Sequence, residues 1–170
     1  TGVQTCALPI LRKTVSLDDY TALFSYCSEI GMDTVVSVYD FEGARFAKDV
    51  GINALKIASS NITHQPLIEF VAALQLPMLL DTGHSTVEEI ARAVNWARDA
   101  GANELILEHS PVAPPRLVSE HNLRFMEALG SMFGVPFGLS DHHNGDEMLY
   151  AAAAMGASIL EKGVRPDNLG

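Results

Sequence analysis

The chain has 170 residues, of which 48% are hydrophobic and 19% charged, a composition typical of one globular domain and not of a disordered segment. Its formal net charge of −10 argues against nucleic acid or an anionic membrane as a partner. A small anionic substrate stays possible, because the local field of a pocket can oppose the global charge. No apolar run approaches the roughly 20 residues that a membrane-spanning helix needs.

Residues 1–10, TGVQTCALPI, carry no charge and show no clear period. The string reads as the translation of a sequencing adapter, so we expect an artefact there and a partial catalytic domain in residues 11–170. An ordinary strand leading into the fold is the alternative. Beyond this segment the sequence contains one cysteine, Cys27, which excludes an internal disulfide and favours a reducing, cytoplasmic location.

Short apolar runs alternate with amphipathic stretches along the rest of the chain. The apolar runs, which we interpret as strands, are 34–39, 53–58, 77–80, 104–107, 135–139 and 157–160. The stretches with a helical pattern include 16–30, 66–74, 87–100, 123–133 and 147–155. Strands that alternate with helices at this spacing predict a parallel sheet covered by helices.

The helix boundaries carry their own signals. Ser16 with Asp19, and Ser85 with Glu88, have the spacing of a capping box, in which each side chain bonds the other residue's free backbone N–H. Glycines follow the helical runs, where a left-handed conformation can end a helix. These are Gly31, Gly51, Gly101, Gly134 and Gly156.

A doubly wound sheet and a closed barrel both fit this alternation, and the strand ends favour the barrel. Nearly every strand ends in polar side chains that can do chemistry: Asp40, Lys56 with Ser59, Asp81 with Thr82, His109, and Ser140-Asp141-His142. A barrel builds its active site from the carboxyl ends of many strands, whereas a doubly wound sheet uses one switch point. We therefore predict an α/β fold, a truncated (β/α)8 TIM barrel with about six of its eight strand–helix units present.

Lys56 lies within a predicted strand, between Leu55 and Ile57. An unpaired ammonium is costly to bury among helices, so we expect Lys56 to face the mouth of the barrel. There it could bind a phosphate or carboxylate, or form a Schiff base. A lysine that reaches solvent from a strand edge is the simpler alternative.

His109 and His142 end neighbouring predicted strands, which lie roughly 4.8 Å apart in a sheet. Two imidazoles at that separation suit a divalent cation such as Mn²⁺, Zn²⁺ or Fe²⁺ and leave positions open for substrate oxygen. Structural or general-acid histidines are the alternative. Asp141 could orient the His142 ring by a hydrogen bond to the nitrogen that does not bind the metal, or it could close an Asx-type turn. The other histidines are expected to be surface or packing residues, and Cys27 a core residue.

Taken together, these segments resemble the N-acetylneuraminate (sialic acid) synthase family and its legionaminic and pseudaminic acid synthase relatives. The Gly138-Leu139-Ser140-Asp141-His142 run is the most specific match. The other matching segments are Lys56-Ile57-Ala58-Ser59, Asp81-Thr82-Gly83, Glu108-His109-Ser110, Asn122-Leu123 and Ile159-Leu160-Glu161-Lys162. The resemblance extends from about residue 16 to residue 167.

The resemblance implies a cytoplasmic transferase that forms a C–C bond between phosphoenolpyruvate and an N-acetylated amino sugar, releasing phosphate and a nonulosonic acid such as N-acetylneuraminate. It implies that His109 and His142 hold the divalent cation and act in catalysis with Asp141. The substrate-binding residues would be Lys56, Ser59, Asn61, Thr82, Ser37 and Ser140. A homodimer is implied for the full-length protein, with small molecules as its ligands.

The sequence also departs from the family pattern. Asn61 replaces the usual glutamate, Gly163 and Val164 replace histidine and phenylalanine, Ser110 replaces cysteine and His84 replaces methionine. The first two strands, with a catalytic glutamate and a further lysine, are expected to be missing. Two other functions therefore stay open: a Schiff-base aldolase that uses Lys56, and a non-catalytic relative that binds a sugar.

Overall fold

The computed structural model describes residues 15–111 and 117–164. The segment interpreted as an adapter artefact, residues 1–10, lies outside the described part of the chain. Within that part, no helix is both long enough and apolar enough to cross a membrane.

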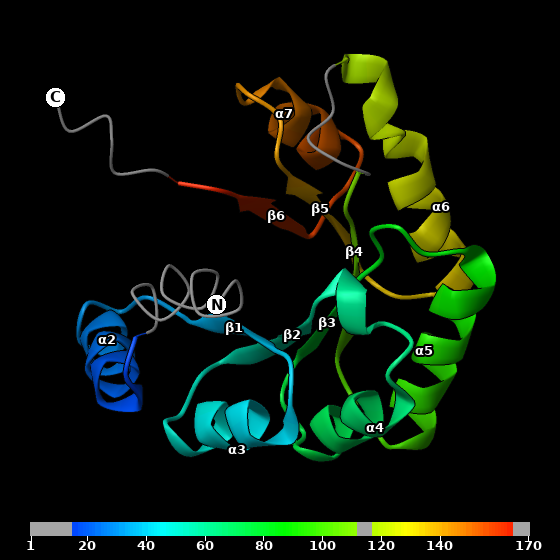
Figure 1. Cartoon of the computed structure of the whole chain (residues 1–170). Coiled ribbons are helices and arrows are strands. Elements are labelled where there is room, and N and C mark those ends of the chain that lie inside the picture. Colours follow the sequence, from blue (N-terminus) through cyan, green and yellow to red (C-terminus); the bar gives the residue numbers. More distant parts are fainter. Residues whose placement is uncertain (1–14, 112–116, 165–170) are drawn as a thin grey trace, which may run out of the picture.

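The six described strands form one parallel sheet whose order follows the sequence, β1-β2-β3-β4-β5-β6. They are β1 (Val35–Val38), β2 (Ala54–Ile57), β3 (Met78–Asp81), β4 (Leu105–His109), β5 (Phe137–Asp141) and β6 (Ile159–Lys162). The sheet curls, with the helices along its outer side (Figure 1). The strand order does not reverse among the described strands, so a doubly wound sheet is excluded for them and the curled arrangement of six parallel strands is confirmed.

The helices that follow the strands are α3 (Phe41–Asp49), α4 (Gln65–Ala73), α5 (Val87–Asp99), α6 (Leu123–Phe133) and α7 (Glu147–Ala154). Helix α2 (Leu17–Glu29) precedes the first described strand, and two short 3-10 helices, η1 (Ser59–Asn61) and η2 (Val118–His121), lie in connections. All five helices named from the sequence are confirmed. A helix at α3 was indicated only by Gly51, which follows it.

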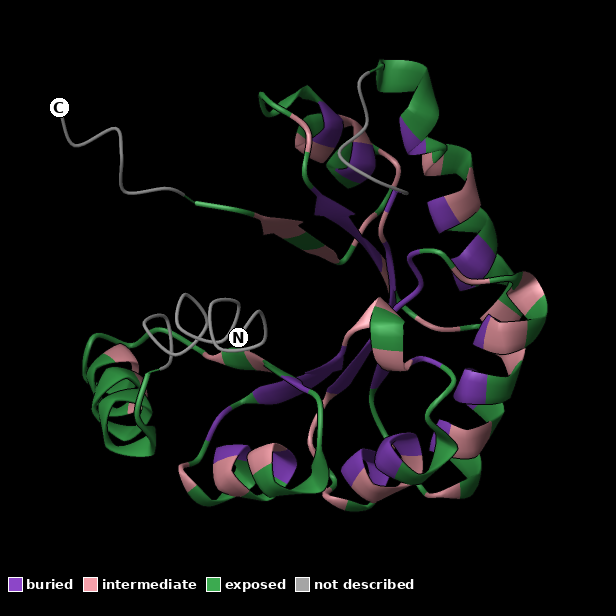
Figure 2. Cartoon of the chain, in the orientation of Figure 1, coloured by how far each residue is buried: buried purple, intermediate pink, exposed green. Residues whose placement is uncertain are grey.

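The main core lies between the sheet and the outer helices, where the buried residues gather (Figure 2). Side chains alternate along a strand, so Leu55 and Ile57 of β2 enter this core together with Ile68 of α4. Lys56 therefore points to the opposite, concave face. The central strands β2 and β3 are buried along their whole length, which explains why their sequences do not alternate between apolar and polar residues.

Two expectations about helices need correction. Helix α5 is capped by Thr86 and not by Ser85: Glu89 N donates to Thr86 Oγ1 at 3.2 Å, and Thr86 N donates to Glu89 Oε2 at 2.8 Å. The segment Ser85-Thr86-Val87-Glu88-Glu89 offers two equally spaced pairs, and the Ser85 hydroxyl instead donates to the Gly83 backbone oxygen at 3.0 Å. Cys27 was expected in the core but is only half-buried. It lies on α2, and no residue of this helix is buried.

Candidate active site

A cluster of charged side chains forms on the concave face, and Lys56 is at its centre. The Lys56 ammonium lies 3.2 Å from Asp81 Oδ2, 2.6 Å from Glu108 Oε2 and 2.8 Å from Glu161 Oε2. These carboxylates come from β3, β4 and β6, so the curl of the sheet brings together side chains up to 105 residues apart in sequence. The prediction that Lys56 faces the concave side is confirmed. Three carboxylates therefore lie within ion-pair distance of one ammonium, and Glu161 accepts a hydrogen bond from it.

The protonation states within this cluster follow from burial and charge. Burial alone would lower the pKa of Lys56, but the charge of Glu108 and the contacts with Glu108, Glu161 and Asp81 raise it above its ordinary value. Burial raises the pKa of Glu108 to about 7, although the Lys56 charge opposes the shift. Lys56 therefore stays protonated at neutral pH, and an ammonium cannot attack a carbonyl to form a Schiff base.

Glu108 is the most enclosed member of the cluster, with a fully buried side chain. It forms a close ion pair with Lys56, and its oxygens accept no hydrogen bond from any other described residue. A carboxylate that is buried with so few hydrogen bonds depends on its counter-ion. The stability of this region therefore rests on the Lys56 charge.

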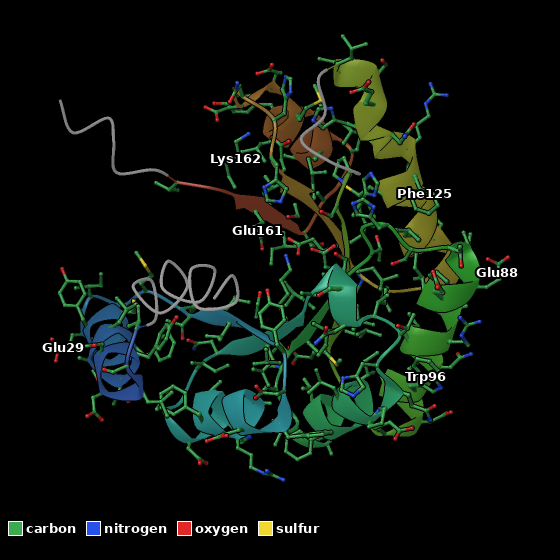
Figure 3. All side chains as sticks on the ribbon, viewed as in Figure 1. Glu29, Glu88, Trp96, Phe125, Glu161 and Lys162 are labelled. Carbon is green, nitrogen blue, oxygen red and sulfur yellow. The ribbon has the colours of Figure 1, made fainter. Side chains whose placement is uncertain are left out.

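Ser140, another predicted substrate-binding residue, joins the same cluster from β5. Its hydroxyl donates to Glu161 Oε1 at 2.9 Å, while the other oxygen of Glu161 accepts from Lys56. Glu161 lies on β6, the last described strand of the curled sheet (Figure 3). Lys56 and Ser140 thus meet at one carboxylate. Sequence reasoning named both donors but did not identify Glu161.

His109 ends β4 and turns toward the connection to α6. Its Nε2 lies 2.7 Å from the backbone oxygen of His121, and its ring meets Phe125 edge-on at a centroid distance of 5.6 Å. Burial lowers the pKa of His109, which favours the neutral ring. A carbonyl only accepts, so Nε2 carries the proton and Nδ1 is left as the basic nitrogen.

A cavity of about 690 Å³ opens beside His109. Hydroxyl groups, an amide and a guanidinium surround an apolar patch that includes Phe125. The polar lining includes Thr82, Ser85, Ser110, Asn122 and Arg124. This mixture suits a small polyhydroxylated ligand.

Asp141 is buried at the end of β5, but its partners differ from the expected one. Its Oδ1 lies 3.2 Å from His121 Nε2 and accepts from His143 N at 3.0 Å, and its Oδ2 accepts from Lys162 Nζ at 2.6 Å. Burial would raise the pKa of Asp141, but the bond from Lys162 and the other donors lower it. Asp141 therefore holds the fully buried His121, a residue that sequence reasoning assigned to the surface or to packing.

His142, the other predicted metal ligand, is exposed at the end of β5. Imidazole is a donor that divalent cations accept, and His109 at the end of β4 and His142 directly after β5 follow neighbouring strands. No group of three or more His, Cys, Asp or Glu within residues 15–111 and 117–164 is arranged to hold a metal ion. The histidine pair is therefore a partial donor set.

The remaining predicted substrate-binding residues lie around the cluster. Thr82 is buried and donates its hydroxyl to the Glu108 backbone oxygen at 3.2 Å, which ties β3 to β4. Asn61 donates to the Tyr39 backbone oxygen at 3.2 Å. Ser59 is half-buried in η1, and Ser37 is exposed on β1 opposite Lys56 in the register. None of these four residues contacts the Lys56 ammonium within the described structure.

Comparison with known proteins gives consistent matches. A family model described as the NeuB family matches residues 8–168. An N,N'-diacetyllegionaminic acid synthase of Legionella pneumophila is 28% identical, over 87% of this chain and 43% of the relative. A pseudaminic acid synthase of Helicobacter pylori is 30% identical, over 89% of this chain and 44% of the relative. The chain thus spans less than half the length of these curated relatives.

The fold also matches a solved structure. The crystal structure of N-acetylneuraminic acid (sialic acid) synthetase from Leptospira borgpetersenii serovar Hardjo-bovis, in complex with citrate, superposes with a TM-score of 0.82 at 28% sequence identity. The match covers 87% of this chain and 52% of that chain. The curled six-stranded sheet is therefore shared with a solved synthase.

Proposed function

Since the chain belongs to the NeuB family, we propose that the full-length protein is a phosphoenolpyruvate-dependent sugar acid synthase. It would condense phosphoenolpyruvate with an N-acetylated amino sugar, similar to N-acetylmannosamine, and release phosphate and a nonulosonic acid such as N-acetylneuraminate. The six described strands would be consecutive units of a (β/α)8 barrel. We further propose a cytoplasmic homodimer.

One observation carries the proposal: on the concave face, Lys56 and Ser140 both donate hydrogen bonds to a single carboxylate, that of Glu161. Phosphoenolpyruvate has two anionic groups, and an ammonium beside a hydroxyl is a suitable donor pair for either one. The position lies near the carboxyl ends of the strands, where barrels of this kind bind their substrates.

The reaction would proceed by attack of carbon 3 of phosphoenolpyruvate on the sugar aldehyde, addition of water at carbon 2 and departure of phosphate. Lys56 and Ser140 would hold the anion and fix the direction of carbon 3. Nδ1 of His109, the ring nitrogen left free by the contact with the His121 backbone oxygen, would be its metal-binding atom, and the neighbouring cavity would receive the sugar. A divalent cation, when bound by His109 and His142, would polarise the sugar aldehyde.

Two features of the cluster bear on the alternative functions. The raised pKa of Lys56 counts against a Schiff-base aldolase. The enclosure of Lys56 by three carboxylates favours a non-catalytic, sugar-binding relative, as do the departures from the family pattern at Asn61 and Gly163. The test is incubation of the full-length protein with phosphoenolpyruvate, Mn²⁺ and a panel of N-acetylated amino sugars. The proposal expects phosphate release that requires both substrates, and binding of a sugar without phosphate release would favour the non-catalytic relative.

A further inference from the structure

Glu161 makes a contact that no predicted role accounts for. Its carboxylate bridges two donors on different strands: Oε2 accepts from Lys56 Nζ at 2.8 Å, and Oε1 accepts from Ser140 Oγ at 2.9 Å. A substrate carboxylate, or two oxygens of a phosphate, would bind the same two donors in the same way. We propose that Glu161 is an internal stand-in for the substrate anion, and that a bound anion takes its place. This inference rests on the proposed function for the identity of that anion.

Exposure identifies Glu161 as the partner that leaves. Its side chain is 43% exposed, compared with 10% for Asp81 and none for Glu108. A half-exposed carboxylate can move into water without first crossing a buried region. The buried carboxylates of Asp81 and Glu108 keep their ion pairs with Lys56 when Glu161 moves. Glu161 can therefore release Lys56 and Ser140 together, and Lys56 stays in place to receive another anion.

The charge balance of the cluster gives the exchange its direction. Three carboxylates surround one ammonium, so an added anion would raise the repulsion unless one carboxylate leaves. Departure of Glu161 limits that increase, because one negative charge leaves as the substrate anion enters. Glu161 is tethered to the same fold, and its high effective concentration makes it a strong competitor. The affinity of the site for small anions should therefore rise when the charge of Glu161 is removed.

The experiment measures binding of inorganic phosphate and, separately, phosphoenolpyruvate to the full-length protein by isothermal titration calorimetry at pH 7.5. Glu161→Gln is expected to bind both anions about ten-fold more tightly than the unmodified protein, and Ser140→Ala more weakly. The matched control is Glu147→Gln, which removes the same charge from an exposed residue on α7 that faces His143 at 3.5 Å. The control should stay within about two-fold of the unmodified protein.

An unchanged or weakened phosphate affinity in Glu161→Gln would overturn the inference, as would the absence of binding in both proteins. Glu161→Ala is the second variant, with the same expected tightening. A purely structural role would lower the unfolding midpoint of both variants without tightening phosphate binding. The phosphate measurement does not depend on turnover. If phosphate binds more tightly but no synthase activity exists, the proposed function fails and the stand-in role is kept.

Discussion

Replacement of Lys56 by methionine tests the account of the charged cluster most severely. The change leaves Glu108, whose side chain is fully buried, and Asp81, whose side chain is 10% exposed, without the ammonium that holds them. Removal of one partner from a buried ion pair costs about 3–5 kcal/mol. A domain has only about 5–15 kcal/mol of net stability, so the loss should be large.

The loss should also depend on pH. Glu108 has a pKa raised to about 7 even beside Lys56, and without the Lys56 charge this pKa rises further. A group with a raised folded-state pKa stabilises the fold below its unfolded value, and the contribution disappears as the pH rises through the folded-state value. The Lys56→Met protein should therefore lose more stability at pH 8 than at pH 6.

Urea unfolding of the full-length protein measures this effect. The triple variant Lys56→Met/Asp81→Asn/Glu108→Gln removes the stranded charges and should recover at least half of the lost stability. Lys48→Met is the matched control, because Lys48 is exposed and, among the described residues, donates only to the Leu74 backbone oxygen, at 2.8 Å. A loss of under about 1 kcal/mol in Lys56→Met at pH 8, similar to the control, would refute the view that Lys56 neutralises a buried cluster.

Three further predictions concern catalysis and the histidines. The triple variant should have a higher KM for phosphoenolpyruvate than Asp81→Asn/Glu108→Gln, which keeps Lys56, with a far smaller rise in the KM for the sugar; a change in the sugar KM alone would contradict the anion role. The full-length protein should bind Mn²⁺ stoichiometrically, and His109→Ala and His142→Ala should each weaken binding about ten-fold in equilibrium dialysis; unchanged binding in both would exclude the pair as ligands. His121→Phe should leave His109 in the Nε2–H tautomer, because the acceptor is the His121 backbone oxygen; a mixture of tautomers in the ring ¹⁵N shifts would contradict this assignment.

The sequence was sufficient to predict the strands, the order of the units and the face on which Lys56 lies. Alternation places Lys56 opposite Leu55 and Ile57, and the cost of an unpaired charge among helices excludes the core side. Strands β3 to β6 end later than their apolar runs: β4 includes His109 and β5 includes Asp141, whereas β1 and β2 lie within theirs. The polar residues that follow an apolar run, such as His109 and Asp141, still pair with the neighbouring strand, as the apolar residues before them do.

The partners within the site could not be predicted from the sequence. Lys56 and Glu161 are 105 residues apart, and only the curl and register of the sheet bring them together. His121 lies in a connection, where spacing carries no signal, and its role depends on the buried contact with Asp141. Glu108 directly precedes His109, yet alternation sends the two side chains to different surroundings.

Mass spectrometry of the reaction products tests the central claim most directly. The full-length protein, incubated with phosphoenolpyruvate and an N-acetylated hexosamine, should form one nine-carbon sugar acid for each phosphate released. A parallel incubation with pyruvate and borohydride should leave Lys56 unmodified, since its ammonium stays protonated. A reduced pyruvate adduct on Lys56, with no sugar acid formed from phosphoenolpyruvate, would contradict the account.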